Sequence, residues 1–169
     1  MSVSIQALST KMVEVLEADT SLRAFRASIR GNSTYGLTEH CPMVPEVDDL
    51  GRFTVQDTYT PYLCVTNVAK ELVAWDGESA FSNILLVRRV LGILNTERPT
   101  YENEADLKDF AILTFAVLTG DTMQAELKAL GMKADLIVAG ATNGLGPIPQ
   151  AAFFWDVHLM VAGSGVMRG

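Results

Sequence analysis

Histidine and cysteine, two residue types that often bind metals or take part in catalysis, are scarce in this sequence. Its 169 residues include two histidines, His40 and His158, and two cysteines, Cys41 and Cys64. None of these residues has the C-x₂-C or H-x₃-H spacing that is typical of a zinc site. In a chain without a secretion signal, two cysteines indicate free thiols rather than a bridge. The sequence therefore predicts no metal site and no cofactor.

Long hydrophobic runs are also lacking, although 49% of the residues are apolar and the mean hydropathy is +0.21. The longest runs, residues 110–118 and 84–94, are shorter than the roughly 20 residues that span a membrane. The first residues lack the basic stretch and apolar run of a secretory signal. We therefore expect an intracellular protein that does not enter a membrane. Its high apolar content indicates surfaces buried against partners.

Positive charge is in deficit. Lysine and arginine number 13 against 20 aspartates and glutamates, which gives a net charge of −7 and a pI of about 4.7. A nucleic-acid-binding surface needs an excess of basic side chains. The composition therefore argues against nucleic acid as the main partner.

The length and pattern predict a single domain, residues 1–169, with four parts. Residues 31–60 contain several prolines and glycines, so we expect an irregular arm, long enough to lie on a neighbouring molecule. Around it we expect a helical segment at 1–30, a core of sheet and helices at 61–162 and a flexible tail at 163–169.

Hydrophobic periodicity predicts an α+β fold, with helices packed on one face of a mostly antiparallel sheet. The order is α-β-β-α-β-β. Residues 81–95 have a length that also suits a helix, but their β-branched residues favour a strand paired with 61–68. Asp121 and Gln124 resemble a capping box that begins a short helix ending at Gly131. The expected helices are 3–17 (resumed to 30), 101–119 and 121–130, and the expected strands are 61–68, 81–95, 134–142 and 151–162.

The stretch AAFFWDVHLMVAG, residues 151–163, alternates between two kinds of side chain. Its odd positions, from Phe153 to Val161, are all apolar and predict a core-facing side. Its even positions place Asp156 and His158 on one face, beside Phe154 and Met160. An Asp–His pair suits general-base chemistry, but no G-x-S-x-G nucleophile accompanies it. We expect a surface that meets another subunit; the alternative is a small enzyme or ligand-binding domain using Asp156 and His158.

Two groups of arginines interrupt apolar segments. Arg23, Arg26 and Arg30 follow one stripe of the second helical segment and suit an acidic partner, DNA phosphates or a solvated face. Arg88 and Arg89 stand inside an apolar strand, so at least one must leave the core or pair with an acid. They either discourage edge-to-edge association or form an ion pair between subunits.

The order of these segments is similar to that of a known family. LEADTSLRAF (16–25), TPYLCVTNV (60–68) and FFWDVHLMVAG (153–163) follow one another as helix, strand and final strand. In this the chain resembles the tail-terminator and tail-completion proteins of long-tailed bacteriophages, from which the long 31–60 arm departs.

The resemblance implies a structural virion protein, assembled in the host cytoplasm, with no catalytic residues. Such subunits form a ring, commonly a hexamer, that ends the tail tube and joins it to the head. DNA passes through the ring without being specifically bound. Within the same class, the alternative is a head-completion or stopper protein of the neck. The residues expected to contact other subunits, the tail tube or neck proteins are Arg23, Arg26, Arg30, Tyr35, Phe53, Tyr59, Arg88, Arg89, Phe154, Asp156, His158 and Met160.

Overall fold

The computed structural model describes residues 3–30, 49, 61–67, 74–75, 83–95, 101–131, 137–142, 151–162 and 166–167. These residues contain both helices and strands, so the predicted α+β class is confirmed. The helices are α1 (Ile5–Ala18), α2 (Thr20–Arg30), α3 (Tyr101–Leu118) and α4 (Asp121–Ala129). The strands are β1 (Val3–Ser4), β2 (Tyr62–Asn67), β3 (Ala74–Trp75), β4 (Asn83–Asn95), β5 (Ile137–Thr142), β6 (Ala151–Ala162) and β7 (Val166–Met167).

Among the described residues, the main sheet has five strands and is antiparallel. Its order is β2-β4-β6-β5, and β3 also pairs with β4. The prediction that residues 81–95 form a strand paired with 61–68 is therefore confirmed. The near-continuous apolar sequence of β4 agrees with its central position in the sheet, since Val87, Val90, Leu91 and Ile93, which lie on both of its faces, are buried. A small second sheet joins β1 and β7 in parallel, so two residues of the expected flexible tail form a strand.

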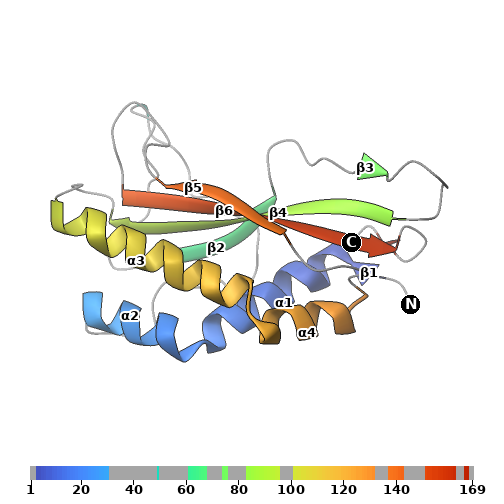
Figure 1. The fold of residues 1–169 in the computed structure, drawn as a ribbon, viewed down its shortest axis with the longest axis horizontal. Helices are drawn as coiled ribbons and strands as arrows, with labels where there is room; N and C mark the ends of the chain where they lie inside the picture. Colours follow the sequence, from blue (N-terminus) through green and yellow to red (C-terminus); the bar gives the residue numbers. More distant parts are fainter. Residues whose placement is uncertain are drawn as a thin grey trace.

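The four helices lie together on one side of the sheet (Figure 1). Helix α3 packs on β4, β5 and β6, whereas α1 packs on β2 and against α4. The core between these layers contains the predicted odd positions of β6, with Phe153, Val157 and Leu159 almost fully buried. The predicted core-facing side of this strand is confirmed. Burial of side chains of this size is the main stabilising contribution to such a fold.

A close contact between β4 and β6 fixes the middle of this core. Gly92 lies opposite Phe153, and a Cβ atom at Gly92 would stand 2.2 Å from Cε1 of the phenylalanine ring. The ring in turn meets Phe110 of α3 edge-on, with centroids 5.0 Å apart. Phe110 also stacks on Phe25 of α2 at 5.3 Å. The missing side chain of Gly92 thus makes room for an aromatic stack that joins the sheet to two helices.

The opposite face of the sheet has its own smaller apolar cluster. Cys64 of β2, Leu91 and Ile93 of β4 and Ala152 of β6 are buried there, with Phe154 half-buried beside them. This is the even face of β6 that the sequence assigned to a subunit contact. The sheet therefore has apolar side chains on both faces.

The helices begin and end at short junctions. Asp19 separates α1 from α2, and its Oδ1 accepts a hydrogen bond from the backbone N–H of Leu22 at 2.9 Å, which caps α2. Gly131, at a φ of 106°, ends α4 as predicted. The predicted capping box at Asp121 and Gln124 is wrong. The N-cap is Gly120, which makes no side-chain capping bond, so Asp121 is the first residue of the helix and not its cap.

Candidate interaction surface

Arg89 and Asp156 form the main polar contact on the even face of β6. They are directly opposite in the β4–β6 register. Nε of Arg89 donates to Oδ1 of Asp156 at 2.8 Å, and Nη2 donates to Oδ2 at 3.0 Å. This two-pronged geometry is the strongest form of an arginine–carboxylate pair. The expectation that one arginine of β4 leaves the helix-covered core and pairs with an acid is confirmed.

The same guanidinium also covers an aromatic ring. Its Cζ lies 4.1 Å from the centroid of Phe154, which is two residues before Asp156 on the same face. Hydrogen bonding to Asp156 raises the pKa of Arg89, and partial burial opposes this effect. The guanidinium of Arg89 therefore contacts both the Phe154 ring and the Asp156 carboxylate on this face.

His158 is the next residue along this face. It is half-buried and lies opposite Val87 of β4 and Ile137 of β5. Among the described residues, no hydrogen bond joins His158 to Asp156, whose two oxygens both accept from Arg89. The Asp–His arrangement that a general base requires is thus not formed within this part of the chain.

The arginines of α2 do not share one environment. Arg23 is exposed, whereas Arg26 is 2% exposed. Within the described residues, Nε and Nη2 of Arg26 have no hydrogen-bond partner. Burial lowers the pKa of Arg26, and the charge of Glu17 acts in the opposite direction. Arg30 ends α2, and its side chain lies outside the described residues, so only Arg23 is available on the surface described here.

Arg88 and Arg89 point to opposite faces of β4. Arg88 is 1% exposed and lies on the helix-covered side, opposite Val157. Because β4 is paired on both sides, by β2 and by β6, these arginines do not protect a sheet edge. A role in contacts between subunits stays a prediction for both.

The remaining expected contact residues are only partly described. Tyr35, Phe53 and Tyr59 of the predicted 31–60 arm lie outside the described residues. Met160 belongs to β6, opposite Leu85, but its side chain is outside the description.

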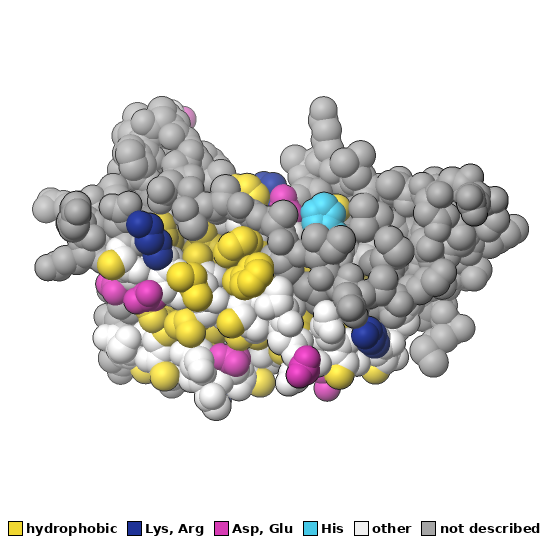
Figure 2. All heavy atoms as spheres, viewed as in Figure 1, with side chains coloured by type: hydrophobic (Ala, Val, Ile, Leu, Met, Phe, Trp, Pro, Cys, Tyr) yellow, Lys and Arg dark blue, Asp and Glu magenta, His cyan; other side chains and the backbone are white. Residues whose placement is uncertain are grey.

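Helix α3 carries an apolar surface that the sequence reasoning did not include. Ile112 is 63% exposed and Phe115 is 38% exposed. Phe115 packs against Trp155 of β6, with ring centroids 5.0 Å apart. The indole N–H of Trp155 donates a hydrogen bond to the carbonyl oxygen of Ala111 at 3.0 Å. Hydrophobic side chains gather in the middle of the molecular face along α3 (Figure 2).

A signal for this surface is present in the sequence. The run FAILTFAVL, residues 110–118, is apolar on every side of a helix, not along one stripe. A helix packed on a sheet buries only one side, so some apolar residues of this run must face outward.

No helix in the described part of the chain is long and apolar enough to cross a membrane. No group of three or more histidine, cysteine, aspartate or glutamate side chains within the same residues is placed to hold a metal ion.

The comparison with known proteins gives no relative from which a role could be transferred. No protein-family model matches this chain, and no curated protein matches it.

Proposed function

We propose that this chain is a structural protein of a phage virion, a tail terminator that forms a ring on the tail tube and joins it to the head or neck. A head-completion or stopper protein of the neck is the alternative within this class. In this proposal the protein is not an enzyme, binds no cofactor, and lets DNA pass without binding it specifically.

The observation that carries the proposal is the exposed apolar side of α3. Ile112 and Phe115 present exposed large hydrophobic side chains, and the Phe115 ring lies next to Trp155. Such groups are usually covered when they cluster on a protein surface. Together with an apolar content of 49%, this supports a subunit whose surfaces are covered in an assembly, and a second copy of the chain is the simplest partner.

The proposal also assigns roles to the rest of the chain. The domain is an α-β-β-α-β-β subunit, and residues 31–60 form the arm that lies on a neighbour. The face of β6 that carries Phe154, Asp156 and His158 contacts an adjacent subunit. The exposed arginine of α2, Arg23, meets an acidic tube or neck protein.

Size-exclusion chromatography with light scattering tests the assembly directly. The wild-type chain should elute as a ring-sized oligomer, and Ile112→Asp should shift it towards monomers. Ala125→Asp, an exposed position on α4, is the matched control and should leave the mass unchanged. A wild-type chain that stays monomeric at high concentration, alone and with purified tail tubes, contradicts the proposal.

Negative-stain images separate the two members of the class. A tail terminator caps isolated tail tubes, whereas a stopper binds portal-bearing capsids. The reading frames on either side of the gene provide a second test, since capsid, portal and tube genes should surround it.

A further inference from the structure

A cavity of about 570 Å³ opens between the two helix–helix junctions of the domain. It lies where α1 turns into α2 at Asp19 and where α3 turns into α4 at Gly120. Its volume is within the range of about 300–1,000 Å³ that is typical of ligand sites. The apolar part of its wall comes from α1 and α3 and consists of Val15, Ala18, Leu113, Ala116 and Val117.

The polar part of the wall is strongly acidic. Four carboxylates, those of Glu14, Asp19, Asp121 and Glu126, line it together with a single ammonium group, that of Lys11. Positive charge is therefore in deficit at the cavity.

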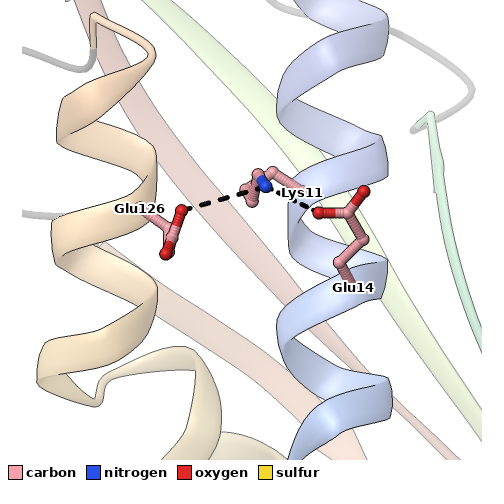
Figure 3. A network of polar contacts seen from close by, with 3 residues as sticks. All are labelled: Lys11, Glu14 and Glu126. Carbon is pink, nitrogen blue, oxygen red and sulfur yellow. Dashed lines mark hydrogen bonds and ion pairs between the residues drawn. The ribbon is translucent and has the colours of Figure 1, made fainter.

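The cavity already holds one cation of the chain itself. The Lys11 ammonium lies between α1 and α4, 2.6 Å from Glu14 Oε2 and 3.8 Å from Glu126 Oε2 (Figure 3). The hydrogen bond to Glu14 raises the pKa of Lys11. A charged group on an aliphatic stem thus fits this wall, with the stem along helix α1 and the charge between carboxylates.

Helix ends of both polarities meet at the cavity. Helices α2 and α4 begin there, and their partial positive charges lie beside Asp19 and Asp121. Helices α1 and α3 end there, and neither has a basic residue in its last turn. Two partial positive and two partial negative helix ends largely offset one another, so the preference for a cation comes from the four carboxylates of the wall.

We propose that this cavity docks a short segment of another polypeptide, in which arginine or lysine stands next to aliphatic residues. The basic groups meet the carboxylates, and the aliphatic groups cover the wall formed by Val15, Leu113 and Val117. A lone small cation would leave that wall in water, and an acidic or purely apolar segment would meet uncompensated negative charge. This inference does not depend on the ring proposal, since neither Ile112 nor Phe115 lines the cavity.

Fluorescence anisotropy tests the docking with a labelled, terminally blocked hexapeptide, Leu-Arg-Leu-Leu-Arg-Gly. Asp121→Asn with Glu126→Gln should weaken its binding about tenfold, since two exposed ion pairs are lost. Lys11→Met removes the competing cation and should tighten binding about threefold. Asp109→Asn removes an exposed acid outside the cavity and is the control for loss of a negative charge. It should leave the affinity for the hexapeptide unchanged. Ala116→Phe, which fills the cavity, should abolish binding, and thermal melts check that each variant is folded.

Several results would overturn this proposal. The first is no saturable binding of the hexapeptide, and the second is equal binding of a peptide with citrulline in place of arginine. The third is a weaker affinity for the hexapeptide in both Lys11→Met and the Asp121→Asn, Glu126→Gln variant. Removing a positive charge and removing negative charges would then have the same effect, so the charges would act through the stability of the fold and not by contact with the peptide. A fourth is loss of self-association in the Asp121→Asn, Glu126→Gln variant. That result would make a second copy the occupant, whereas loss only in Ile112→Asp leaves the peptide site intact.

Discussion

Two hydrogen bonds join the side chains of Arg89 on β4 and Asp156 on β6, which are 67 positions apart in the sequence. Both side chains are only partly exposed, at 33% and 22%. The pair therefore links the two central strands at one register position, on the face away from the helices.

Breaking this pair should destabilise the domain modestly. We expect Asp156→Asn to lower the free energy of unfolding by about 1 kcal/mol, because a charge-assisted pair at a partly exposed site is lost. A double-mutant cycle with Arg89→Met, followed by urea denaturation, measures the coupling, which should shrink at high salt. A coupling energy near zero at low salt would show that the contact contributes nothing to stability.

Gly92→Ala should lower the stability of the domain. The new methyl group would stand 2.2 Å from the Phe153 ring, which is fully buried and packed on Phe110. Overpacking of this kind costs about 1–3 kcal/mol. Gly120→Ala is the matched comparison, since its nearest neighbour would be the Ala116 carbonyl oxygen at 3.1 Å. Thermal denaturation should give Gly92→Ala a clearly lower Tm than Gly120→Ala. The reverse order of the two Tm values would contradict the packing described here.

Trp155→Phe should loosen helix α3 from the sheet. The substitution removes the N–H that donates to the Ala111 carbonyl oxygen at 3.0 Å, and it shrinks the ring that meets Phe115. A loss of about 1–2 kcal/mol is expected for this bond and contact. Hydrogen exchange should report faster opening of α3 than of α1. Equal acceleration in both helices would indicate a global effect instead.

Arg26→Met should leave stability unchanged or raise it, by about 1 kcal/mol. A buried guanidinium with two nitrogens that lack partners among the described residues is costly, and a flexible apolar side chain of similar length avoids that cost. Burial lowers the pKa of this group, which agrees with a site that disfavours its charge. Arg23→Met, at an exposed position of the same helix, is the control and should have little effect. A marked loss of stability in Arg26→Met alone would mean that the charge is needed.

The sequence predicted the elements whose pattern is local. Alternation along 151–162 identified Phe153 and Val157 as core residues, and β-branched residues identified 83–95 as a strand. The capping box failed because Asp121 has the right spacing but Gly120 takes the cap position. Local pattern does not reveal which acid an arginine meets when the partner is 67 residues away, as for Arg89.

The exposed side of α3 could not be read from the pattern of one helix. Ile112 and Phe115 lie in a run that is apolar all round, and only the placement of α3 on β4, β5 and β6 decides which side is left uncovered. The burial of Arg26 has a similar origin. It depends on what packs over α2, not on the charge stripe that the sequence displays.

The place of β6 in the sheet has a consequence for how the chain folds during synthesis. Strand β6 lies between β4 and β5, yet it is made after both of them. Until residues 151–162 leave the ribosome, β4 has only β2 and β3 beside it, and β5 has no partner among the described strands. Pairing of β5 into the sheet must therefore wait for residues 151–162, and until then β5 and one edge of β4 can pair with other strands. Slower synthesis should then lower the soluble yield of this protein, and a chain ending before β6 should aggregate.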